Sequence, residues 1–208
     1  MGITSKHISN TQVARSMPFD NSTNGFTSTD TQSAIEEAKS SGAASGTKFF
    51  YADQVDSPNN ANWAVNANAP ASSDSANSAL LVRRFDDTAE EGIGFEMFIP
   101  AGITTLTLGI KARAQTAPGT AQTVIMRLYN RQIPNNAAIT AWSAALQLTT
   151  LSVPANAFYQ YYSQAITLAT LGITAGRTVQ FELTRQGSNA SDTLVGDFDL
   201  FELSVGMS

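Results

Sequence analysis

The sequence predicts an all-β protein: an antiparallel β-sandwich of about eight strands, with a jelly roll preferred, preceded by an extended N-terminal arm with one short helix. From about residue 49 onward, apolar and polar residues alternate with the period of two that is typical of strands. Gly, Pro and Asn cluster between the alternating runs, as expected for turns. No amphipathic pattern of helical length separates these runs, so two antiparallel sheets must cover each other's apolar faces.

The chain is expected to divide into an N-terminal arm, residues 1–48, and a sandwich domain, residues 49–208. The arm is polar and ends in a linker rich in Ser, Gly and Ala. A helix over about residues 30–40 is expected there, because Thr29 and Gln32 form a capping box. Such a short helix is marginal alone, so we expect the arm to become ordered against other subunits, or else against the sandwich domain. The large apolar side chains it offers for attachment are Phe19, Phe26 and Ile35.

The strands of the sandwich domain follow from the alternation. The clearest predicted strands are 105–113, 123–131 and 178–184. Further candidates are 48–55, 80–86, 93–99, 143–152, 160–168 and 193–206. In the last candidate the apolar phase changes after Leu200, which predicts a β-bulge near residues 200–201 or burial on both faces. In 178–184, Glu182 and Thr184 are expected on the polar, outward side. Trp63 is the one large apolar residue of the loop 56–79 and is expected to anchor it.

Composition disfavours several classes of function. The net charge is −5, so the chain lacks the electropositive surface of a nucleic-acid binder. There is no cysteine, and the single histidine, His7, lies in the arm, so disulfides, zinc–thiolate sites and Ser-His-Asp triads are not expected. No apolar run reaches the about 20 residues of a membrane span, and no signal peptide is evident. We therefore expect no cofactor, no nucleic-acid partner and no membrane insertion.

Carboxylates are the remaining candidates for chemistry. Adjacent carboxylates occur at Asp86-Asp87 and Glu90-Glu91. Neighbours in a strand point to opposite faces, so neither pair forms the dyad, about 5–10 Å apart, of a glycosidase, and we expect no enzyme. Asp192 and Asp197, with Asp199 nearby, offer oxygen ligands suited to calcium. Capping of turns by Asp is the competing interpretation, and the sequence leaves open whether an ion is bound there.

Aromatic residues indicate a candidate carbohydrate contact. In the predicted strand 160–168 and just before it, Tyr159 and Tyr161 share one face, while Phe158 and Tyr162 share the other. If the tyrosine pair is exposed, it can stack on sugar rings, and Trp142 at the start of a neighbouring predicted strand can contribute. The alternative is that these rings pack in the core or in a subunit interface, where aromatic residues are common.

Two parts of the chain resemble structural proteins of tailed bacteriophages. The segment 13–39, VARSMPFDNSTNGFTSTDTQSAIEEAK, is similar to a segment found near the starts or joints of virion proteins. The second resemblance is looser and lies in the sandwich domain. It comprises an aromatic strand ending in Ile-Pro, residues 95–100, and an Arg-x-Gly…Asp-Thr-Leu-x-Gly-Asp pattern, residues 185–187 and 192–197.

The resemblance implies a component of the virion, assembled in the bacterial cytoplasm, with a short attachment segment and a jelly-roll head that is often trimeric. We expect a capsid-surface decoration or head-fibre protein that attaches through its arm to other virion proteins of the capsid or tail. The alternative is a tail-fibre or baseplate module that binds a host surface glycan. A homotrimer is the expected assembly. The sequence does not indicate whether the protein sits on the capsid, the neck or the tail.

Overall fold

The computed structural model describes residues 46–51, 54–55, 64, 69–74 and 81–208. The predicted arm helix, the side chains of Phe19, Phe26 and Ile35, and Trp63 lie outside the described residues, so their predicted roles stay predictions. The first strand begins at Gly46, three residues before the expected start of the sandwich domain. No helix among the described residues is long and apolar enough to cross a membrane.

Strands dominate the described part of the chain. Their bounds are β1 Gly46–Tyr51, β2 Ala71–Asp74, β3 Leu81–Phe85, β4 Glu90–Ile99, β5 Thr105–Ala114, β6 Gln122–Val124, β7 Met126–Ile133, β8 Leu146–Gln147, β9 Leu151–Val153, β10 Gln160–Thr167, β11 Arg177–Gln186 and β12 Phe198–Met207. One helical turn, α3 (Leu168–Leu171), follows β10. Thr167 caps its first turn through its side chain, and Gly172 ends it with a positive φ of 65°.

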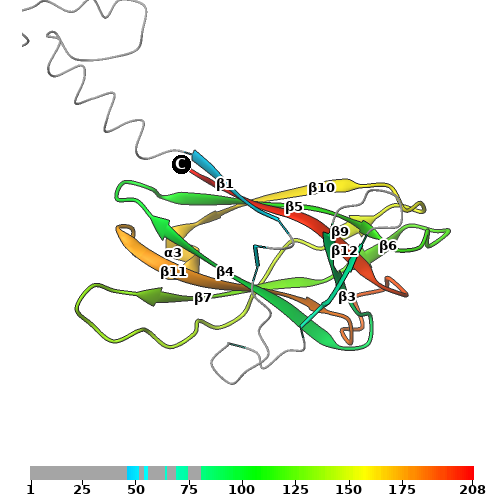
Figure 1. Cartoon of the computed structure of the whole chain (residues 1–208), viewed down its shortest axis with the longest axis horizontal. Coiled ribbons are helices and arrows are strands. Elements are labelled where there is room, and N and C mark those ends of the chain that lie inside the picture. Colours follow the sequence, from blue (N-terminus) through cyan, green and yellow to red (C-terminus); the bar gives the residue numbers. More distant parts are fainter. Residues whose placement is uncertain (1–45, 52–53, 56–63, 65–68, 75–80) are drawn as a thin grey trace, which may run out of the picture. The chain divides into compact units, whose positions relative to one another are not determined.

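The strands form two facing antiparallel sheets, confirming the predicted fold class (Figure 1). One sheet has the order β10-β5-β12-β3-β2, with β1 also paired to β12, and the other has the order β4-β11-β7-β8. From β3 to β5, and again from β10 to β12, the chain passes from one sheet to the other at each step, and after β6 it continues into the four-stranded sheet with β7. The orders β3-β12-β5-β10 and β4-β11-β7-β8 are those of a jelly roll. Strands β6 and β9 form a separate two-stranded ribbon.

The core lies between the sheets and is built from the predicted apolar phase. In β5, Leu106, Leu108 and Ile110 are buried, as the alternation predicts. Phe95 of β4 stacks on Phe181 of β11 with ring centroids 5.1 Å apart. Burial of apolar side chains between the two sheets holds them together, and it is the main stabilising contribution in a two-layer fold.

The phase change in the last strand corresponds to a β-bulge. The register of β12 against β5 shifts between Leu200 and Glu202, so that Phe201 is the extra residue and is also buried. After the bulge, Leu203 and Val205 return to the core. The predicted irregularity near 200–201 is therefore confirmed.

Four strand predictions need correction. The expected strand 123–131 is divided between β6, which pairs with β9, and β7, which pairs with β11. The expected strand 143–152 is instead two short pieces, β8 and β9, which pair with different strands. The expected strand 193–206 begins only at Phe198, because backbone carbonyls before it are held by a buried arginine described below. Glu182 and Thr184 are fully buried rather than outward and solvated. Glu182 accepts a hydrogen bond from the backbone N–H of Ala64, and Thr184 donates to Glu90.

Candidate functional site

The outer surface of the six-stranded sheet carries a group of exposed aromatic rings. In register across four strands, Tyr161 of β10 lies opposite Lys111 of β5, Lys111 opposite Glu202 of β12, and Glu202 opposite Tyr51 of β1. These residues alternate with buried neighbours, so their side chains share the outer face. We call the surface formed by Phe49, Tyr51, Tyr159 and Tyr161 the aromatic face.

Three rings of the aromatic face are half or more exposed: Tyr161 by 61%, Tyr51 by 51% and Phe49 by 50%. Phe49 belongs to the adjacent row, where Ser163, Gly109, Ser204 and Phe49 lie side by side on β10, β5, β12 and β1. Tyr161 points outward, so its predicted place on the face opposite to that of Tyr162 is confirmed.

Gly109 lets Tyr161 lie down on the sheet. A Cβ atom at Gly109 would collide with the Tyr161 hydroxyl and ring and with the Ser204 hydroxyl. The Tyr161 side chain therefore crosses β5 in the space that the missing side chain leaves, as glycine in a strand allows. Its hydroxyl lies 3.2 Å from the Ser204 hydroxyl, within hydrogen-bond distance. The ring is thereby held across the strands rather than standing free in solvent.

Tyr162 points to the other side of the strand. Its hydroxyl donates a hydrogen bond to the backbone carbonyl of Ser152 at 3.1 Å, and its ring lies 6.5 Å from that of Phe198. Burial raises the pKa of Tyr162 to about 12. Tyr162 therefore packs on the inner side of β10 and is not part of the aromatic face.

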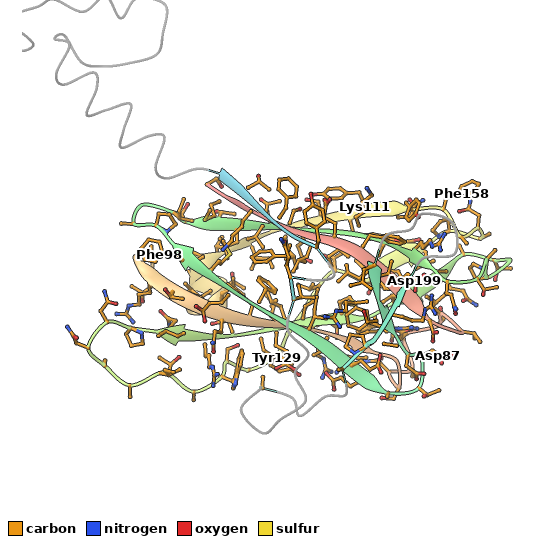
Figure 2. The ribbon with its side chains drawn as sticks, in the orientation of Figure 1. Asp87, Phe98, Lys111, Tyr129, Phe158 and Asp199 are labelled. Atoms are coloured by element: carbon orange, nitrogen blue, oxygen red, sulfur yellow. The ribbon has the colours of Figure 1, made fainter. Side chains whose placement is uncertain are left out.

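An open cleft of about 690 Å³ continues the aromatic face at the end of the sheet. We call it the end cleft; its lining residues are Arg113, Gln115, Ala117, Asn156, Ala157, Phe158 and Tyr159. Phe158 is 71% exposed and lines this cleft together with Tyr159. Figure 2 shows Phe158 and Lys111 on the side of the molecule formed by the six-stranded sheet.

Arg113 holds Tyr159 in the wall of the end cleft. Its guanidinium carbon lies 5.2 Å from the Tyr159 ring centroid and 5.5 Å from that of Phe201, within the range of cation–π contacts. Tyr159 also packs edge-on against Phe201, with centroids 4.5 Å apart. Arg113 is buried, and its Nε lies 3.7 Å from a carboxylate oxygen of Asp199. The bulged residue Phe201 is thus the support on which the Tyr159 ring rests.

Trp142 does not join the two tyrosines. It lies in the segment before β8, which pairs with β7 of the four-stranded sheet. The guanidinium of Arg131, on β7, lies 4.6 Å from the Trp142 ring centroid. The predicted neighbourhood of Trp142 and Tyr161 is wrong, because only the later part of this segment contacts β10, through Thr149 and Ser152, whereas Trp142 packs on Arg131 of β7. The sequence reasoning also missed Phe49 and Tyr51, whose only signal was alternation with the buried Phe50.

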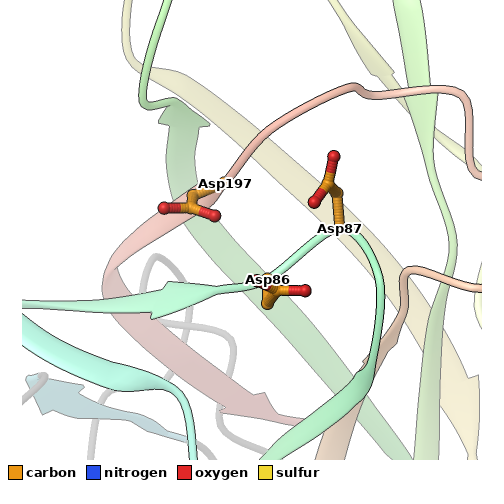
Figure 3. Close-up of side chains that lie close together, drawn as sticks. All are labelled: Asp86, Asp87 and Asp197. Carbon is orange, nitrogen blue, oxygen red and sulfur yellow. The ribbon is translucent and has the colours of Figure 1, made fainter.

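The carboxylates gather at one end of the sandwich and are largely engaged within the protein. Oxygens of Asp86, Asp87 and Asp197 lie within 4.8 Å of one another (Figure 3). Asp86 accepts hydrogen bonds from the backbone N–H and hydroxyl of Thr88, which lower its pKa. Asp87 accepts from the backbone N–H of Gly196 at 2.6 Å. Asp86 therefore caps its own turn, as expected of Asp, and Asp87 joins this turn to the β11–β12 loop.

Two carboxyl groups at this end have raised pKa values. Burial is the largest cause for Asp197, with the nearby Asp86 and Asp87 adding to it and Arg84 opposing it. Burial likewise raises the pKa of Glu91, although its carboxylate accepts a hydrogen bond from the backbone N–H of Asp86. Both groups therefore hold their protons to a higher pH than ordinary exposed carboxyls.

Asp192, which the sequence offers with Asp197 as a candidate calcium ligand, is not a member of this acidic cluster. It forms a fully buried, bidentate ion pair with Arg185: Nη2 to Oδ1 at 2.9 Å and Nε to Oδ2 at 3.2 Å. Oδ2 also accepts the backbone N–H of Ile125 at 3.0 Å. Both oxygens of Asp192 are used, so this carboxylate is a structural group.

The same arginine explains the Arg-x-Gly…Asp-Thr-Leu-x-Gly-Asp pattern. Besides Asp192, Arg185 donates to the backbone carbonyls of Phe85, Leu194 and Gly196, so all five N–H groups are engaged. Gly187 is required because a Cβ there would lie 2.5 Å from the backbone of Asp87. This pattern therefore ties the β11–β12 loop to the ends of β3 and β6.

Comparisons with known proteins find no match to a family model and none among curated proteins. Among solved structures, the enzymatically active domain of bacteriophage CBA120 tailspike protein 4 is similar at 9% identity, with 80% of this chain and 20% of that chain covered and a TM-score of 0.39. A family 35 carbohydrate-binding module from Clostridium thermocellum is similar at 13% identity, covering 77% and 97%, with a TM-score of 0.42. The C-terminal CBM6 of LamC from Zobellia galactanivorans is similar at 11% identity, covering 77% and 98%, with a TM-score of 0.41. Likenesses this distant carry no argument about function, and the strand order alone establishes the jelly roll.

Proposed function

We propose that this chain is a structural protein of a tailed-bacteriophage virion whose jelly-roll domain binds a glycan through the aromatic face. The resemblance of residues 13–39 supports the virion assignment and an attachment role for the arm. The glycan-binding role is supported by one observation above all: three exposed aromatic rings share a sheet face, and the Tyr161 ring is fixed in place across Gly109.

Sugars match such a surface because they are amphipathic. The C–H faces of a pyranose ring pack on an aromatic ring, while its hydroxyl groups take hydrogen bonds from polar groups at the side. On this sheet Lys111 and Glu202 lie between the outer rings, in register with Tyr161 and Tyr51. Rings and hydrogen-bonding groups thus alternate over a short distance, as in specific sites for polar ligands.

A second copy of the chain fits this face less well. A stable interface buries about 800 Å² per partner, and charged residues are depleted from its centre. Here Lys111 and Glu202 occupy the centre of the row, with aromatic rings at its ends. We therefore assign the aromatic face to a glycan and keep the homotrimer as a proposal that concerns the arm.

We propose a binding role and no catalysis. Of the residues in the two rows that build the face, Glu202 alone is a carboxylate, and a glycosidase needs two. The other named carboxylates lie elsewhere in hydrogen bonds or ion pairs, such as Asp192 with Arg185. Capsid decoration through the arm remains the second candidate, supported by the same N-terminal resemblance. It predicts that loss of the protein weakens the particle and leaves adsorption to cells unchanged.

Binding of the purified full chain to immobilised bacterial capsular and O-antigen polysaccharides tests the proposal. We expect retention on at least one of them, reduced in Tyr161→Ala and unchanged in Phe98→Ala. Phe98 is a matched control because it is 57% exposed on β4 of the opposite sheet. Equal retention of the two variants would contradict the assignment of the site, and no retention on any polysaccharide would contradict glycan binding.

A further inference from the structure

We infer that the aromatic face binds an internal segment of an extended, uncharged polysaccharide that runs across the strands from β10 to β1. This inference rests on the proposed glycan-binding function and specifies the ligand class and its direction. Three observations carry it: the order of the rings, the open ends of the row and the balance of charge.

The order of the rings gives the direction. The Tyr161 side chain starts on β10, passes over Gly109 of β5 and brings its hydroxyl to Ser204 of β12. The in-register neighbour of Ser204 on β1 is Phe49. Side chains directly opposite each other on one face have Cβ atoms about 4.5–5.5 Å apart. The rings of Tyr161 and Phe49 therefore follow one another along a line perpendicular to the strands.

The open ends of this line indicate an internal segment. From β10 to β1 there are three steps between neighbouring strands, which is roughly 14 Å at the usual spacing. A single sugar ring does not cover that distance. Among the described residues, β10 pairs only with β5 and β1 only with β12. The segment beside β10 contacts Gln164 and Tyr162, so no paired strand continues the row at either end. A site for a terminal sugar would instead be an enclosed pocket.

The charges beside the rings balance. Lys111 and Glu202 are direct cross-strand neighbours on this face, with opposite charges. At the end cleft, Arg113 and Arg84 lie beside Asp199, and Arg84 also lies 3.7 Å from Asp197, so two arginines face two aspartates. A surface that concentrates an acidic polymer needs an excess of positive charge, and the face shows none. Its charged pair suits hydrogen bonds to the hydroxyl groups of a neutral chain.

A length series tests the inference. The probes are fragments of one to eight sugars, prepared from the neutral polysaccharide that the full chain retains most strongly, and titrated by calorimetry. We expect affinity to rise with length until the row is filled, and reduction of the terminal sugar to leave the affinity of the long fragments unchanged. Phe49→Ala and Tyr161→Ala should each weaken the longest fragment about three- to tenfold, as expected for one aromatic contact, and Phe98→Ala should not.

The outcomes separate this inference from the proposed function. If a glycan binds but one or two sugars bind as tightly as eight, or if reduction of the terminal sugar abolishes binding, the ligand is a chain end and the inference is wrong. If only acidic polysaccharides bind, the assignment to a neutral chain is wrong. If Phe49→Ala leaves all lengths unaffected while Tyr161→Ala does not, the direction across the strands is wrong. In each of these cases glycan binding itself would stand.

Discussion

Removing one partner of the Arg185–Asp192 ion pair should greatly lower the free energy of unfolding of the protein. Both side chains are fully buried, so either one left alone is an uncompensated charge in the core. Breaking such a pair costs about 3–5 kcal/mol, against a typical total of about 5–15 kcal/mol for a domain. We therefore expect Asp192→Asn to lower the free energy of unfolding by about 3–5 kcal/mol.

Arg185→Met should cost at least as much, because it also removes the donors to the carbonyls of Phe85, Leu194 and Gly196. Each buried acceptor left without a donor costs about 1–3 kcal/mol. For the same reason, the double variant Arg185→Met with Asp192→Leu should recover only part of the loss. The three carbonyls stay unsatisfied even when both charges are gone.

Urea unfolding of the full chain, followed by tryptophan fluorescence and circular dichroism, measures these values. Arg127→Met is the control, because Arg127 is only half-buried, and we expect a loss below about 1 kcal/mol for such a site. A loss below about 1 kcal/mol for both Asp192→Asn and Arg185→Met would refute the reasoning, because loss of one partner of a buried ion pair should destabilise the protein by more than that. Full recovery in the double variant would show that the carbonyl contacts do not matter.

The remaining predictions concern the face, the acidic cluster and the arm. Gly109→Ala should leave a folded protein, at a cost of about 1–3 kcal/mol, but displace Tyr161 and reduce polysaccharide retention as Tyr161→Ala does; unchanged retention would contradict the role of Gly109. Asp197→Asn should raise the melting temperature at neutral pH, because the raised pKa of Asp197 means that its charged form opposes folding above that pKa. The gain should shrink as the pH falls through the raised pKa towards 3.8 and vanish below it, and a variant less stable than wild type at neutral pH would refute this. A triple alanine variant of the arm should fold normally but fail to attach to particles, and full occupancy on particles would show that the arm is not the anchor. The residues replaced are Phe19, Phe26 and Ile35.

Much of the sandwich could be predicted because each strand carries its own signal. Alternation places Leu106, Leu108 and Ile110 inward, and the change of phase at Leu200 marks the bulge. The burial of Glu182 could not be predicted, since it depends on a contact with Ala64, far away in the sequence. Local alternation reports which side chains share a face but not what later covers that face.

The candidate site was predicted only in part for a related reason. Tyr159 and Tyr161 are two residues apart at the start of β10, so the period of two places them on one face from the sequence alone. Phe49 and Tyr51 reach the same surface only because the jelly-roll crossovers put β1 beside β12 and β12 beside β5. Trp142 was grouped with them wrongly, because the predicted strand that it begins is divided and its first part lies against β7 rather than β10. The role of Gly109 depends on where the Tyr161 ring lies, which no local pattern records.

The most direct test of the central claim is the adsorption rate of a phage whose copy of this protein carries both Phe49→Ala and Tyr161→Ala, compared with a phage carrying Phe98→Ala. If the aromatic face binds the host glycan, the double variant loses adsorption, while its particles resist heat as well as wild type and the control adsorbs normally. Normal adsorption of the double variant would contradict the claim. If its particles were also heat-sensitive, the result would favour the capsid-decoration role instead.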